Sequence, residues 1–129
     1  MEQIPEEMYK KYMDCDIKRW KEEIDIINVE MIFYKDLLER NLKDCPDWNT
    51  IDYGSLLQSI NDVEYYNQRH QRDFLAFHNQ LSIMAECEDV QCESHFFDKH
   101  SELKGGIENH FSIYKQFKKN LFSHLKNTV

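Results

Sequence analysis

Glycine and proline are scarce in this chain, with 3 Gly and 2 Pro among 129 residues. So few turn-forming residues favour a few long elements over many short strands. No apolar run approaches the roughly 20 residues that a helix needs to cross a bilayer. Residues 1–7 are acidic and are not followed by the apolar core of a signal peptide. We therefore expect a cytoplasmic protein without a membrane partner.

Basic residues are also in the minority, since 16 Lys and Arg stand against 24 Asp and Glu, for a formal net charge of −8. A nucleic-acid-binding protein needs a basic face, and an anionic membrane surface would repel this chain. We therefore expect no nucleic-acid partner. The acidic balance is typical of a protein kept soluble by its charge.

Recognisable catalytic motifs are lacking. The chain has no glycine-rich phosphate loop, no Gly-x-Ser-x-Gly and no His-Glu-x-x-His. This absence favours a non-enzymatic protein.

The four cysteines are not spaced to bind one metal ion together. Cys45 lies in the first expected turn, and Cys87 and Cys92 flank the second, at the opposite end of an antiparallel bundle. They therefore cannot converge on one zinc ion. We expect free thiols, as is usual in the cytoplasm. A metal held by Cys87, Cys92 and His95, or a local disulfide, is the alternative.

The strongest pattern in the sequence is a helical periodicity of apolar residues. Apolar residues recur at alternating steps of three and four in three segments, at about 5–44, 52–86 and 93–126. This spacing is typical of the seam of a helical bundle. Pro46 ends the first segment, and the length suits one domain, 1–129. The sequence predicts an all-α domain, an up-down-up antiparallel three-helix bundle with long helices.

Gly105 and Gly106 interrupt the last segment. A break there would give four helices. We favour a continuous helix, because the apolar register runs through the pair without a shift and a tight helical hairpin needs more than two loop residues. Helix pairing places the two glycines across from Phe74 and near Trp20, where the lack of a side chain would allow close packing.

Three seam positions near the middle of the bundle are polar: Asn67, His70 and His110. Antiparallel pairing places them within about one helical turn of one another. Buried polar groups must be hydrogen-bonded, so this polar core layer implies mutual pairing, a water or an ion. A polar layer that specifies the helix register is the simplest interpretation.

A metal site in the same layer is the alternative function. Glu23 and Glu30 flank the seam of the first helix, so His70, His110 and the two carboxylates are candidate ligands for a transition metal such as zinc or iron. The Glu-x-x-His pairs of di-iron bundles are missing. Without a metal, we expect the protein to need no cofactor.

The first helix carries a second apolar stripe away from the seam. It consists of Ile26, Val29, Ile32, Phe33 and Leu37. In a three-helix bundle such a stripe would be exposed, and exposed apolar patches mark interfaces. We therefore expect a self-associating interaction or scaffold protein, a homodimer or higher oligomer formed through the first helix. Another protein as the partner, or a fourth helix after Gly105 and Gly106 that covers the stripe, are the alternatives.

Parts of two helices resemble a known family. In the first helix, Trp20-x-x-Glu23 is followed by Phe33-Tyr34-Lys35-Asp36-Leu37-Leu38, and the last helix contains residues 96–100 and Tyr114-Lys115-Gln116-Phe117-Lys118-Lys119. These segments are similar to those of a family of small bacterial proteins of unknown function. The resemblance covers about half of the chain. It implies a helical bundle and assigns no activity and no functional residue.

Overall fold

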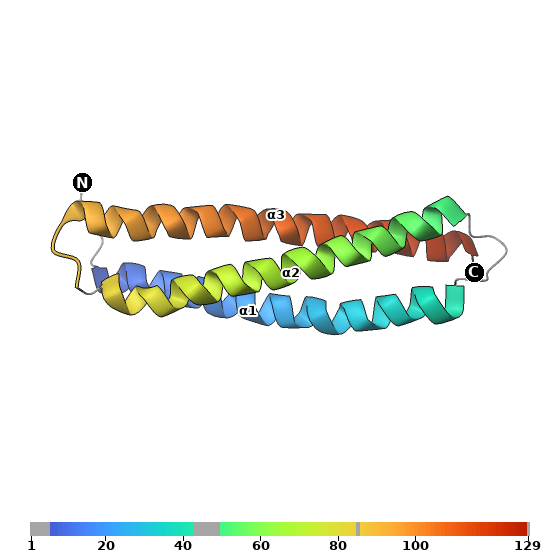
Figure 1. The fold of residues 1–129 in the computed structure, drawn as a ribbon, viewed down its shortest axis with the longest axis horizontal. Helices are drawn as coiled ribbons and strands as arrows, with labels where there is room; N and C mark the ends of the chain where they lie inside the picture. The colour runs from blue at the N-terminus through green and yellow to red at the C-terminus, as the bar shows by residue number, and fades with distance from the viewer. Residues whose placement is uncertain (1–5, 43–49, 85, 129) are drawn as a thin grey trace.

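The computed structural model describes residues 6–42, 50–84 and 86–128. It contains α1 (Glu6–Asp36), a π-helical continuation η1 (Leu37–Leu42), α2 (Thr50–Met84) and α3 (Val90–Thr128). The three long helices lie side by side and alternate in direction, with α2 crossing between α1 and α3 (Figure 1). The predicted all-α, up-down-up three-helix bundle is confirmed. None of the described helices is long and apolar enough to span a membrane.

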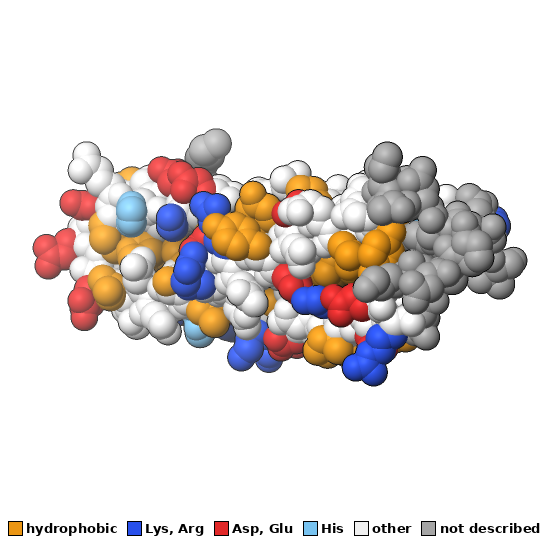
Figure 2. Space-filling model, turned by 45° about the vertical axis from the view of Figure 1, so that its right-hand side comes forward, with side chains coloured by type: hydrophobic (Ala, Val, Ile, Leu, Met, Phe, Trp, Pro, Cys, Tyr) orange, Lys and Arg blue, Asp and Glu red, His pale blue; other side chains and the backbone are white. Residues whose placement is uncertain are grey.

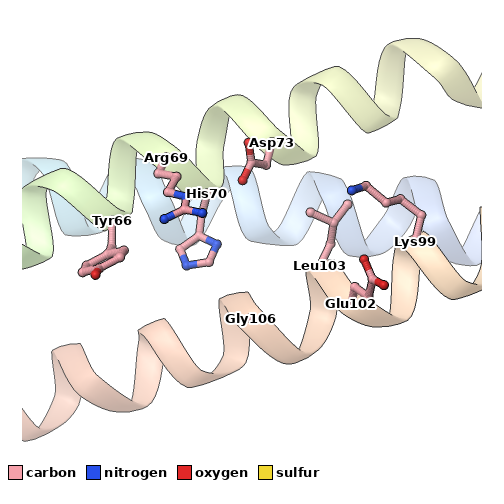
Figure 3. Close-up of a pocket in the computed structure, with 8 residues that line it drawn as sticks. All are labelled: Tyr66, Arg69, His70, Asp73, Lys99, Glu102, Leu103 and Gly106. Carbon is pink, nitrogen blue, oxygen red and sulfur yellow. The ribbon is translucent and has the colours of Figure 1, made fainter.

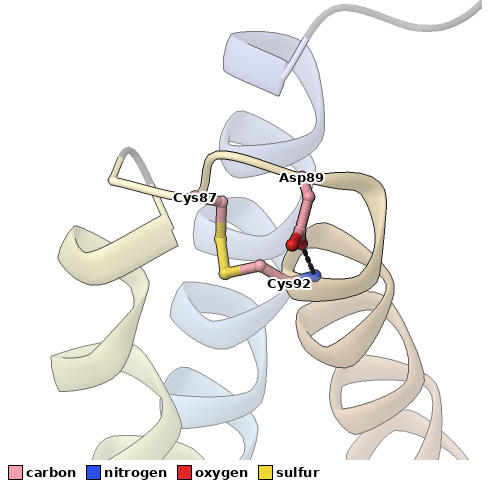
Figure 4. Close-up of a disulfide and its surroundings, with 3 residues drawn as sticks. All are labelled: Cys87, Asp89 and Cys92. Carbon is pink, nitrogen blue, oxygen red and sulfur yellow. Dashed lines mark hydrogen bonds between the residues drawn. A yellow bond between two sulfur atoms is a disulfide. The ribbon is translucent and has the colours of Figure 1, made fainter.

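The second turn is shorter than predicted. We expected the last helix to begin near 93, but α3 begins at Val90. The carboxylate of Asp89 accepts a hydrogen bond from the backbone N–H of Cys92 at 2.8 Å (Figure 4). This is the geometry of an N-cap, which satisfies an amide left unpaired by the helix itself. The predicted first turn, with Cys45 and Pro46, lies outside the described residues.

The core follows the predicted seam on all three helices and forms two clusters. The cluster nearer the α1–α2 end includes Met31, Leu38, Ile60 and Leu121. The other, nearer the α2–α3 turn, comprises Met13, Ile17, Trp20, Ile24, Phe74, Phe77, Leu81, Met84, Phe96 and Ile107. The polar layer described below lies between the two clusters.

Helix α3 runs through Gly105 and Gly106 without a break, so the four-helix alternative is wrong. A Cβ atom at Gly106 would lie 3.3 Å from Cε1 of His70, while one at Gly105 would meet nothing within 4 Å. The expected contacts with Phe74 and Trp20 are therefore wrong. Both α2 and α3 have bounds two to three residues earlier than expected, at Met84 and Val90, so different residues of the two helices face each other.

The two glycines should respond differently to alanine. We expect Gly105→Ala to raise the free energy of unfolding by about 0.5–1 kcal/mol, because alanine favours the helix and the added methyl meets open space. Gly106→Ala should raise the free energy of unfolding by less, since the His70 ring must move by a few tenths of an ångström. Urea unfolding of the two variants measures the difference. An equal gain at both positions would contradict this account.

Cys87 and Cys92 form a disulfide across the second turn (Figure 4). The expectation of four free thiols is therefore wrong. The short turn brings the two Cα atoms to 5.5 Å, within the range that a disulfide can bridge. The paired sulfurs are not thiolate ligands, so the metal alternative involving His95 also loses its basis. Cys15 remains a free, exposed thiol.

Removal of this disulfide should destabilise the bundle modestly. We expect Cys87→Ser/Cys92→Ser to lower the free energy of unfolding by about 2 kcal/mol, the loop-closure value for so short a loop. Cys15→Ser is the matched control and should change stability by less than about 0.5 kcal/mol, because its side chain is exposed. Denaturant titration with and without reductant provides the measurement. A reductant-insensitive wild type would contradict the prediction.

Candidate functional site: a buried polar layer and an exposed apolar face

Asn67 of α2 is the centre of the polar layer. It is fully buried, and His110 of α3 is 3% exposed. The Asn67 amide Nδ2 donates to the carbonyl oxygen of Ile24 at 3.2 Å and to Oδ1 of Asn28 at 2.7 Å. Its Oδ1 lies 2.9 Å from Nε2 of His110. Because this oxygen can only accept, Nε2 of His110 carries the hydrogen. One side chain therefore joins all three helices.

His70 completes the histidine pair from the edge of the layer. Its ring centroid lies 5.1 Å from that of His110, and its side chain is half-buried. It faces α3 at Gly106 and lines a cavity of about 260 Å³ (Figure 3). The remaining lining residues are Tyr66, Arg69, Asp73, Lys99, Glu102 and Leu103. The structure thus places Asn67 and His110 in direct contact and His70 beside them.

Burial keeps both histidines neutral near pH 7. Desolvation, together with the neighbouring His70, lowers the pKa of His110 to about 4. Desolvation also lowers the pKa of His70, and Arg69 adds to this effect while Asp73 opposes it. A neutral His110 is the form that the Asn67 contact requires, so the hydrogen bonding and the burial favour the same state.

Glu30 lies in a different cluster from the histidines. Its carboxylate accepts a hydrogen bond from the Tyr114 hydroxyl at 2.8 Å and binds Nζ of Lys118 at 3.2 Å. The ammonium also lies 5.4 Å from the centre of the Tyr114 ring. Desolvation and the bond to Glu30 raise the pKa of Tyr114, which keeps the phenol a donor. These contacts tie α1 to α3.

The structure does not assemble the metal site predicted from the sequence. Glu30 is engaged by Tyr114 and Lys118, and Nε2 of His110 is engaged by Asn67. Glu23 is half-buried and lines a shallow groove between α1 and α3 together with Glu30. Within residues 6–42, 50–84 and 86–128, no three His, Cys, Asp or Glu side chains gather as metal ligands would.

A second histidine site lies at the other end of the bundle, at the seam position of His100, and its carboxylate partner was not predicted from the sequence. Nε2 of His100 lies 2.9 Å from a carboxylate oxygen of Asp16, and its ring stacks on Trp20 with centroids 5.6 Å apart. Asp16 also pairs with Arg19 at 3.1 Å. This group links α3 to α1 near the disulfide end, as the Glu30 cluster does near the middle.

The predicted apolar face of α1 is exposed along most of its length. Ile26, Val29, Ile32 and Phe33 are 57%, 69%, 73% and 62% exposed. Leu37 differs, because it is half-buried and packs on the core cluster that contains Leu38. Its assignment to the exposed face is therefore wrong. At the surface of the bundle, hydrophobic side chains form patches among acidic and basic ones, as Figure 2 shows for one side.

No protein-family model, no curated protein and no solved structure matches the chain. The resemblance to small bacterial bundle proteins therefore stays a prediction from the sequence. The site has to be interpreted from its own geometry.

Proposed function

We propose that this protein is a non-enzymatic, self-associating interaction protein that uses the outer face of α1. The observation that carries the proposal is the group of four adjacent apolar side chains at Ile26, Val29, Ile32 and Phe33, each more than half exposed. Contiguous exposed apolar surface on a soluble bundle is characteristic of interfaces. A second copy of the chain is the proposed partner, and a two-fold dimer is the simplest closed assembly.

The polar layer supports a structural role rather than a catalytic one. The Asn67 amide and the His110 imidazole are bonded to one another inside the core, where both side chains are almost completely buried. Such layers fix the register of helices. We also propose a cytoplasmic location, for which the Cys87–Cys92 disulfide is unusual because that compartment keeps thiols reduced.

Sedimentation velocity over a wide concentration range tests the function. We expect a concentration-dependent dimer, and Val29→Glu should raise the dissociation constant by about 100-fold, because each copy would bury an unpaired carboxylate. Ile83→Glu on α2 is the matched control, since Ile83 is 53% exposed and lies on another helix. It should leave the dissociation constant unchanged. A wild-type monomer at every concentration would remove the proposal.

A further inference from the structure

A complete heptad stripe runs along the outer side of α1, opposite the core seam. Its positions follow one another at steps of four and three, and all of them are exposed. The apolar positions are Met8, Tyr12, Cys15, Ile26, Val29 and Phe33. Two charged residues, Arg19 and Glu22, occupy its middle. This is the spacing of a coiled-coil seam that has no partner within the described bundle.

The stripe is complementary to itself when a second copy runs in the opposite direction. If Arg19 of one copy faces Glu22 of the other, the remaining positions pair without further adjustment. Cys15 then faces Ile26, Tyr12 faces Val29, and Met8 faces Phe33. Every apolar position meets an apolar one, and each charge meets the opposite charge.

Other arrangements lack this match. In a parallel, in-register pair, Arg19 would face Arg19 and Glu22 would face Glu22, and like charges in contact are unfavourable. An antiparallel pair shifted by one heptad in either direction would place both charged residues against apolar ones and bury unpaired charges.

We propose that α1 pairs with α1 of a second copy in an antiparallel arrangement, about a two-fold axis between Arg19 and Glu22. The inference rests on the self-association proposed above and specifies its geometry. Glu22 makes no ion pair among the described residues, and Arg19 uses only one nitrogen on Asp16 at 3.1 Å. Both side chains therefore retain capacity for the partner. The contact would extend over about 38 Å of helix.

Disulfide trapping tests the arrangement with the native thiol of Cys15. In a Cys45→Ser background, mild oxidation of Ile26→Cys should give a covalent dimer, because the introduced sulfur would face Cys15 of the other copy. The background alone should stay non-covalent, since its two Cys15 residues would lie about 16 Å apart along the axis. Ile83→Cys, on α2 and 53% exposed, is the matched control and should give little covalent dimer.

Charge reversal gives an independent test by sedimentation. Arg19→Glu and Glu22→Arg should each raise the dissociation constant by about tenfold or more, because each creates like-charge pairs at the axis. An equimolar mixture of the two variants should recover wild-type affinity, since their charges complement one another. Unchanged affinity in the single variants would overturn the proposed pairing.

The two proposals fail differently. A chain that is monomeric at all concentrations removes both the self-association and its geometry. A reduced dimer of Ile26→Cys that stays non-covalent on oxidation, or a covalent dimer through Cys15 alone, contradicts only the antiparallel register.

Discussion

Asn67→Ala is expected to lower the free energy of unfolding by about 3 kcal/mol. The substitution removes the bonds to Ile24, Asn28 and His110 in one step. It leaves the Nε2–H of His110 buried without an acceptor, at a cost of about 1–3 kcal/mol for that group alone. It also opens a cavity between the two core clusters. Urea unfolding at pH 7.5, followed by circular dichroism, measures the loss.

A matched substitution and a double variant separate the polar layer from general packing. Asn61→Ala replaces an exposed asparagine of the same helix and should change stability by less than about 0.5 kcal/mol. Asn67→Leu/His110→Leu replaces both partners with apolar groups and should be more stable than Asn67→Ala, because no buried donor is left unpaired. A double variant as unstable as the sum of its singles would show that the two residues act independently.

Acid should destabilise the bundle through His110. The folded pKa of about 4 lies below the ordinary value of 6.5, so between these values the unfolded chain binds a proton that the folded chain does not. Stability is therefore full above about pH 7 and falls as the pH drops toward 4, by about 2 kcal/mol at pH 5 from this residue alone. The lowered pKa of His70 acts in the same direction. Urea unfolding from pH 8 to pH 5 tests the slope.

The variant His110→Gln tests whether His110 causes the loss of stability in acid. Glutamine cannot be protonated in this range and retains an N–H donor for Asn67, so its pH dependence should be flatter than that of the wild type. His95→Gln replaces an exposed histidine and should keep the wild-type slope. Equal wild-type stability at pH 8 and pH 5 would contradict the assignment.

Heptad spacing was sufficient to predict the fold, because both the helices and their order follow from where the apolar residues lie. The polar positions Asn67, His70 and His110 could be chosen from the seam for the same reason. Asn28 could not, since it is exposed and off the seam and takes part only through Oδ1. Periodicity reports which face a residue occupies and contains no information on where a flexible polar side chain reaches.

Which residues face each other across two helices depends on the length of the turn between them. The sequence predicts that length less accurately than it predicts the helices. The N-cap of α3 at Asp89 shortens the second turn, which changes the contact of Gly106 to His70. An aspartate three residues before Cys92 was a visible capping signal that could have placed the start of α3 correctly. Glu30 was placed near the seam correctly, but its nearest donors are Tyr114 and Lys118 rather than the histidines.

The close approach of Gly106 to His70 makes the two positions epistatic. A Cβ at position 106 would lie 3.3 Å from the imidazole of His70. The effect of alanine at position 106 on stability therefore depends on the size of the side chain at position 70. In a lineage that had already replaced His70 with a smaller residue, the helix-stabilising change at 106 would become freely accessible. Position 105 has no such neighbour, and its substitution history should be independent of position 70.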